Sequence, residues 1–150
     1  MDGAMPINWQ LTVDSADPHA QADFWAEALG YVVEDHDAFI GSLIDQGLVA
    51  ESDYKVRNGR RVFCKGEGIH HPADPPERGA PKRRILFVRV PEAKQVKNRL
   101  HMDLSVGPER REAEVKRIEG LGAAILARVE EPEGIHVTMA DPEGNEFCVQ

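Results

Sequence analysis

The sequence predicts an α+β protein in which one unit, a strand followed by a helix and three further strands, occurs twice. Apolar and polar residues alternate at the start of each half, a helical pattern ending in Leu-Gly follows, and an Asp-Pro turn precedes the last strand of each half. A length of 150 residues matches one domain. We therefore expect a single domain over residues 1–150, with one module at about 6–91 and the other at about 97–150.

The first module opens with apolar residues at every second position of residues 7–15, which predicts a strand with one polar face. Asp17 and Pro18 follow, and they are a favoured helix cap and a favoured first helical residue. Apolar residues then recur at helical spacing as far as Gly30, which predicts the end of the helix.

Additional material lies between this helix and the last strand of the first module. Residues 38–48 are a helix candidate, and residues 66–81 are rich in glycine and proline, which predicts a loop. The adjacent histidines His70 and His71 are then interpreted as loop residues rather than as a ligand pair. Residues 84–90 complete the module as a strand.

The second module repeats this order. Residues 100–106 alternate as a strand, and a charged stretch with one apolar helical face follows and ends at Gly122. Residues 123–129, 135–140 and 145–150 are the three further strands.

The two modules align with a single gap. Gln10 to Gly30 spans 20 positions and His101 to Gly122 spans 21, so Gln10 and His101 occupy equivalent places. A duplicated unit predicts a molecule with approximate two-fold symmetry and a cleft between its halves.

Composition excludes several classes of function. The chain has 18 basic and 26 acidic residues, and its net charge of −8 makes nucleic acid an improbable partner. No apolar run approaches the ~18–20 residues of a membrane span, so we expect no membrane association. The two cysteines are too few for a disulfide framework, which favours a cytoplasmic location.

Residues 13–18, 24–30, 98–104 and 140–148 together resemble the vicinal oxygen chelate superfamily. That superfamily includes glyoxalases, bleomycin-resistance proteins, extradiol dioxygenases and fosfomycin-modifying enzymes, and the chain looks most like glyoxalase-like proteins common in actinobacteria. The resemblance implies two tandem βαβββ modules that form an open, cup-shaped mixed sheet, with helices outside and a small-molecule ligand inside. It also implies a homodimer.

The resemblance further implies a metal site, because metal-using members take ligands from the first and last strands of their modules. The matching candidates here are Gln10, His101 and Glu146, for one divalent ion such as Zn, Ni, Mn or Fe. Glu146 is also the candidate catalytic base. However, Cys148 stands where the family usually has Glu, and the corresponding place in the first module falls on Val88, or on Phe87 if the register shifts by one residue, and neither can bind a metal. The metal site is therefore degenerate, and a metal-free protein is the alternative.

Alternation along the strands directs a set of polar side chains toward the expected cup. The set also includes the aromatic residues Trp9 and Phe87, Arg89 as a clamp for an anionic group, and Cys148 as a small residue of the cup wall. The substrate-binding candidates are Trp9, Thr12, Asp14, Phe87, Arg89, Asp103, His136 and Cys148.

Three functions fit these residues. The leading one is a glyoxalase-like protein that binds a small organic molecule in the cup. The second is a metal-dependent lyase, isomerase or dioxygenase acting on an oxygen-chelating substrate, and the third is a metal-free resistance protein that sequesters a drug. The fold hosts many chemistries, so the sequence does not choose among them.

Overall fold

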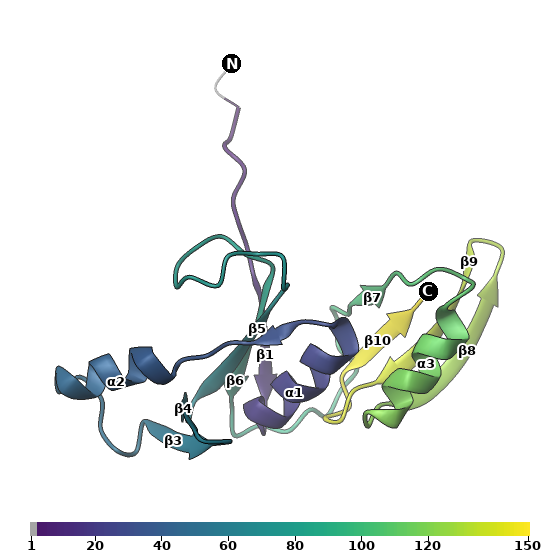
Figure 1. Ribbon diagram of the computed structural model, residues 1–150. Coiled ribbons are helices and arrows are strands. Elements are labelled where there is room, and N and C mark those ends of the chain that lie inside the picture. The colour runs from purple at the N-terminus through teal and green to yellow at the C-terminus, as the bar shows by residue number, and fades with distance from the viewer. Residues whose placement is uncertain (1–2) are drawn as a thin grey trace. The chain divides into compact units, whose positions relative to one another are not determined.

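The computed structural model describes residues 3–150, and the chain divides into two compact units between Val90 and Pro91. Each unit is described by itself. The first contains β1 (Leu11–Ser15), α1 (Pro18–Leu29), β2 (Val32–Val33), α2 (Asp37–Asp45), β3 (Tyr54–Arg57), β4 (Arg60–Phe63), β5 (Gly66–His70) and β6 (Arg84–Arg89) (Figure 1). The second contains β7 (Asp103–Leu104), α3 (Arg111–Gly120), β8 (Ala124–Glu131), β9 (Gly134–Ala140) and β10 (Glu146–Val149).

The two units share one sheet topology. Their strand orders are β1-β6-β5-β2 and β7-β10-β9-β8, so the first strand of each unit lies beside the last. That pair is parallel in both units, while the remaining pairs are antiparallel. The predicted α+β fold built on a duplicated strand–helix–three-strand unit is therefore confirmed. The first unit additionally inserts α2 and the β3–β4 hairpin between its second and third sheet strands.

Helix α1 begins and ends as the sequence predicts. The Asp17 side chain accepts a hydrogen bond from the backbone N–H of Ala20 at 3.1 Å, and this bond lowers the pKa of Asp17. Pro18 takes the first helical position, and Gly30 ends the helix with a φ of 69°. Helix α2 is also present where a helix is expected, although it ends at Asp45 rather than near residue 48.

Each core lies between the helix and one face of its sheet. In the first unit, α1 contacts β5 and β6, and the buried Trp25 and Phe24 pack edge to face at 5.2 Å. Ile85 and Phe87 of β6 are buried and alternate with half-buried neighbours, so the face opposite α1 is the less covered of the two.

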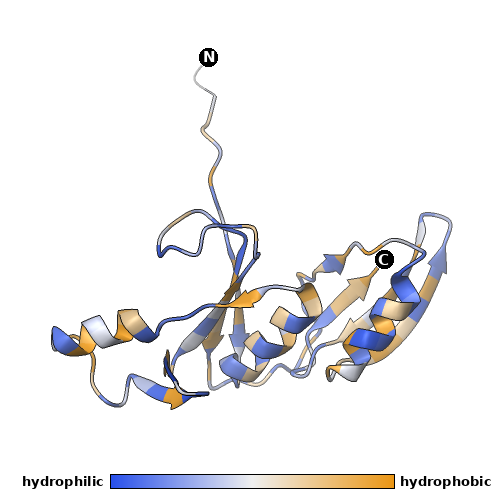
Figure 2. Cartoon of the chain, in the orientation of Figure 1, coloured by the Kyte–Doolittle hydropathy of each residue, from blue (hydrophilic) through white to orange (hydrophobic). Residues whose placement is uncertain are grey.

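The second core has the same construction. Val115 and Ile118 are the buried residues of α3, and Phe147 and Val149 are the buried residues of β10. Figure 2 shows hydrophilic residues interspersed with hydrophobic ones along α3, which suits a helix with one solvent-facing side. No described helix is both long and apolar enough to cross a membrane.

The loop predicted over residues 66–81 is wrong for its first five residues, which form β5 in the interior of the sheet. The glycines responsible for the loop prediction instead allow close packing. A Cβ on Gly66 would lie 2.8 Å from the backbone oxygen of Phe87. His70 is consequently a strand residue with 6% exposure, which corrects its interpretation as a loop histidine.

The first strands of the two modules are shorter than predicted. β1 starts at Leu11 rather than residue 7, and β7 covers only Asp103 and Leu104. Both are edge strands with a partner on one side only, so the alternating sequence extends beyond the hydrogen-bonded ladder. Gln10 and His101 therefore stand just before their strands.

Candidate functional site

Three possible metal ligands meet in the second unit. His101, Asp103 and Cys148 each offer one donor atom, and these atoms all lie within 4.8 Å of one another. The parallel pairing of β7 with β10 places Asp103 directly beside Cys148. His101 stands two residues before Asp103, and its Nδ1 lies 3.2 Å from Asp103 Oδ1. These three residues are called the donor cluster below.

The alternation of β10 explains why Cys148 takes part in the donor cluster. Phe147 and Val149 are buried, so Cys148 between them faces the opposite side of the sheet. Cys148 is half-buried, whereas the side chains of His101 and Asp103 are 41% and 47% exposed. The donor cluster is thus accessible from solvent.

Burial raises the pKa of the Cys148 thiol, and the negative charge of Asp103 acts in the same direction. Thr138 Oγ1, at 3.7 Å from the sulfur, opposes this with a weak hydrogen bond. Cys148 is therefore protonated at neutral pH unless a cation binds beside it. One imidazole, one carboxylate and one thiol form a donor set that fits a divalent transition metal ion.

Glu146 takes no part in the donor cluster. One carboxylate oxygen lies 3.0 Å from Lys94 Nζ, and the other accepts a hydrogen bond from the backbone N–H of Asn98 at 3.0 Å. The Asn98 hydrogen bond, together with Lys94, lowers the pKa of Glu146 to about 2. The assignment of Glu146 as ligand and base stays a prediction, but both of its oxygens already anchor the segment that leads to β7.

The turn after β9 explains how Glu146 is positioned. Asp141 Oδ1 accepts hydrogen bonds from the backbone N–H groups of Glu143 and Asn145, each at 2.9 Å. Asn145 in turn accepts a hydrogen bond from the Asn98 side chain at 3.0 Å. This Asp-Pro turn, one of the motifs that carries the family resemblance, therefore has a structural role here.

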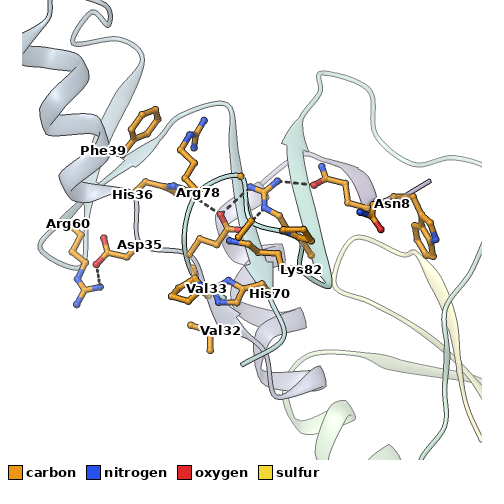
Figure 3. Close-up of a pocket in the computed structure, with 18 residues that line it drawn as sticks. Asn8, Val32, Val33, Asp35, His36, Phe39, Arg60, His70, Arg78 and Lys82 are labelled. Atoms are coloured by element: carbon orange, nitrogen blue, oxygen red, sulfur yellow. Dashed lines mark hydrogen bonds and ion pairs between the residues drawn. The ribbon is translucent and has the colours of Figure 1, made fainter. Parts of the chain in front are cut away.

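A second feature lies in the first unit, on the sheet face opposite α1. It is a cavity of about 770 Å³ lined by the segment before β1, by β2, β5 and β6, and by residues 76–82 (Figure 3). Gln10 lies in its wall, where its side-chain oxygen accepts a hydrogen bond from Arg84 at 3.2 Å. Arg84 also donates to Glu34, whose pKa is lowered by that hydrogen bond in spite of its burial.

The other predicted binding residues are distributed over several environments. Trp9 is 83% exposed and lines the cavity, whereas Trp25 belongs to the core. Phe87 is fully buried, and Arg89 donates hydrogen bonds to the backbone oxygens of Cys64 and Ala16. Thr12 and Asp14 are exposed on β1, and His136 is half-buried on β9. Their roles in binding stay predictions.

Four cavity residues lie outside the set that the sequence predicted to bind substrate: Glu34, Arg78 and Lys82, together with His70, which was interpreted as a loop residue. Lys82 is the first of three consecutive basic residues, Lys82, Arg83 and Arg84, and this run was the available signal in the sequence. Asp103 was expected to bind substrate rather than metal. Its spacing of two residues from His101 on one strand was the available signal for a shared ligand role.

The paired βαβββ units, each with an open sheet face, define a protein of the glyoxalase, bleomycin-resistance and dioxygenase class. The model of the glyoxalase-like domain family matches residues 10–150, and the chain belongs to this family. No curated protein matches the sequence.

Solved structures confirm the fold. A glyoxalase/bleomycin resistance protein/dioxygenase family enzyme from Burkholderia phytofirmans PsJN is 15% identical, with a TM-score of 0.57 over 93% of this chain and 94% of that chain. A glyoxalase-related enzyme from Fulvimarina pelagi is also 15% identical, with a TM-score of 0.55 over 97% and 87% of the two chains. At these identities the likeness shows the fold alone.

A third similar structure carries ligands. It is a mutant of the fosfomycin resistance protein FosX from Listeria monocytogenes, complexed with Mn(II) and 1S,2S-dihydroxypropylphosphonic acid. It is 10% identical, with a TM-score of 0.53 over 100% of this chain and 90% of that chain.

Proposed function

We propose that this protein binds a small, oxygen-bearing organic molecule at a divalent metal ion held by His101, Asp103 and Cys148. The observation that carries the proposal is the convergence of three different donor groups within 4.8 Å on a solvent-accessible sheet face. Ordinary surface clusters are mostly acidic, whereas this one combines imidazole, carboxylate and thiol.

The donor types indicate which metal suits the site. A thiolate is a soft ligand, and its combination with imidazole and carboxylate favours Zn²⁺ over the harder Mn²⁺. A bound ion would supply Lewis acidity toward an oxygen of the ligand. Asp103 lies within reach of His101 Nδ1 and is placed either to share the ion or to orient the imidazole.

The FosX complex supports the ligand class. That protein is shown with a metal ion and a phosphonic acid that carries two neighbouring hydroxyl groups. We carry over to this chain only the general chemistry, a small molecule with adjacent oxygen atoms. The identity of the particular ligand has to be inferred from the residues of this chain.

Binding is better supported than proton-transfer catalysis. The pKa of Glu146 is lowered to about 2, and a carboxylate with so low a pKa is a weak base at neutral pH. Lyase, isomerase and dioxygenase activities therefore remain secondary proposals, as do a homodimer and a cytoplasmic location. Metal-free sequestration is the second candidate, favoured by the cavity of the first unit, which needs no ion to attract a ligand.

The test is metal stoichiometry in protein purified without a polyhistidine tag. After incubation with Zn²⁺ and desalting, elemental analysis should find close to one ion per chain, and His101→Ala and Cys148→Ser should each lose it. Cys64→Ser is the matched control, because Cys64 is the chain's other cysteine and is also half-buried. Retention of zinc by both cluster variants, or no retention by the wild type, would refute the metal centre and leave metal-free binding.

A further inference from the structure

The cavity of the first unit is lined by four cationic and two acidic side chains among the described residues, Arg60, Arg78, Lys82 and Arg84 against Glu34 and Asp35. Arg60 and Arg84 form ion pairs with Asp35 and Glu34 respectively. Arg78 and Lys82 also line the cavity, and within the described residues neither has a carboxylate oxygen within 4.0 Å, although the charge of Lys82 acts on Glu34 over a longer distance. This surplus of positive charge stands out in a chain whose net charge is −8.

We propose that this cavity recognises an anionic group, a carboxylate or a phosphonate, on a small organic molecule, with Arg78 and Lys82 as the recognising residues. The inference rests on the proposed small-molecule function and names its ligand class. It does not depend on the metal, because every residue that lines the cavity belongs to the first unit.

Local contacts hold both cations in place. The Arg78 guanidinium lies 4.0 Å from the centre of the Phe39 ring, and a guanidinium stacked in this way keeps its N–H edges available for a bidentate anion. Lys82 Nζ donates one hydrogen bond to the backbone oxygen of Glu77 at 2.7 Å, which leaves two further N–H donors. Figure 3 shows both side chains among the cavity residues.

The negative charge of Glu34, an acidic residue of the cavity wall, is already compensated. Arg84 compensates the charge of Glu34, and Gly68 supplies the space for that pair. A Cβ on Gly68 would lie 2.7 Å from both Arg84 Nη2 and Glu34 Oε1. His36 Nε2 also approaches Glu34, at 3.6 Å.

His70 adds a polar residue to the wall of this cavity. It lines the cavity with only 6% exposure, and its buried Nδ1 has no hydrogen-bond partner among the described residues. Buried polar atoms are normally satisfied, so this unpaired nitrogen is a hydrogen-bonding group that the described protein groups leave unused. Its strand partner Arg84 shares this face of the sheet.

The inference is tested with phenylphosphonate, benzoate and their neutral analogue benzamide, on protein treated with EDTA. Binding is followed by tryptophan fluorescence at constant ionic strength, because Trp9 is exposed at the cavity while Trp25 is buried. We expect at least one of the two anions to bind roughly tenfold or more tightly than benzamide, as charge-assisted hydrogen bonds predict.

The double variant Arg78→Gln/Lys82→Gln should remove this preference. The control Arg128→Gln/Lys116→Gln changes the net charge equally, but its exposed cations lie in the second unit, and it should retain the preference. Lys82→Gln alone serves if the double variant fails to fold, because it leaves the contact between Arg78 and Phe39 intact. It should weaken anion binding and leave benzamide unaffected.

Three results would overturn the inference: equal affinity for anions and benzamide, unchanged anion binding in the folded cavity variants, or an equal loss in the control variant. The zinc stoichiometry of the same preparations separates the two proposals. Loss of anion preference with zinc retained contradicts only the cavity assignment. Loss of zinc with the anion preference intact contradicts only the metal centre.

Discussion

At the scale of single residues, Cys148 distinguishes this site chemically. A thiol occupies the position where the family resemblance implies a glutamate, and its raised pKa keeps it protonated in the absence of a cation. A metal ion would have to displace that proton, so zinc affinity should increase with pH.

Zinc should therefore protect Cys148 from alkylation. We expect iodoacetamide to modify Cys148 severalfold more slowly when Zn²⁺ is saturating, because the coordinated sulfur is less available as a nucleophile. Peptide mass spectrometry measures the modification at each cysteine separately. Cys64 is the internal control, and equal protection of both cysteines would indicate a general effect of zinc rather than a site at Cys148.

Glu146 should contribute stability rather than catalysis. Its pKa is lowered from 4.5 to about 2, so its contribution is complete above about pH 4.5 and is lost as the pH falls toward 2. We expect Glu146→Gln to reduce the free energy of unfolding by about 1–2 kcal/mol at pH 7, through loss of the charged hydrogen bonds to Lys94 and Asn98. Urea unfolding at several pH values measures this, and the variant should lose less stability than the wild type between pH 4.5 and 2.

At the scale of elements, the close approach of β5 to β6 depends on the absence of a side chain at Gly66. We expect Gly66→Ala to destabilise the fold by about 1–3 kcal/mol, because the added Cβ would lie 2.8 Å from a backbone oxygen that cannot rotate away. Thermal unfolding measures the effect. Gly134→Ala is the control, since nothing lies within 4 Å of its added Cβ, and equal losses in both variants would contradict this explanation.

The packing of α1 predicts a pH effect through His19, which is 1% exposed. Burial lowers its pKa, and the charges of Lys55 and Arg57 act in the same direction against an opposing contribution from Glu67. Below about pH 6.5 the unfolded chain binds a proton more readily than the folded one, so stability falls as the pH decreases, by at most about 1.4 kcal/mol per unit. Denaturant titration of the wild type and of His19→Gln measures this, and an identical slope in the variant would exclude His19 as the cause.

At the scale of the whole molecule, the sequence predicted the duplicated unit and helix α2, but it missed the β3–β4 hairpin and one strand of the repeated sheet, β5. The strand and helix patterns beginning near Gln10 and His101 appear twice, and both sheets have the predicted duplicate topology. The β3–β4 hairpin was missed, although Asn58 and Gly59 form a two-residue turn with positive φ at both positions. β5 was missed because its glycines serve close packing rather than a turn.

The candidate site could be predicted only in part, for a similar reason. Alternation correctly placed Cys148 on the face opposite the buried Phe147. The alternation of polar and apolar residues carries no information about which polar side chains bind one another. It therefore did not reveal that the Glu146 carboxylate is hydrogen-bonded to Lys94 and Asn98, or that the Glu34 carboxylate is hydrogen-bonded to Arg84. Long-range pairing of charges decides which groups remain available to a ligand, and local periodicity does not encode it.

X-ray absorption spectroscopy of the zinc-loaded protein tests the central claim most directly. Coordination by His101, Asp103 and Cys148 predicts one sulfur scatterer at about 2.3 Å together with nitrogen and oxygen scatterers at about 2.0–2.2 Å. The sulfur contribution should disappear in Cys148→Ser and persist in Cys64→Ser. A first shell composed only of nitrogen and oxygen in the wild type, or a sulfur signal lost in Cys64→Ser instead, would contradict the proposed centre.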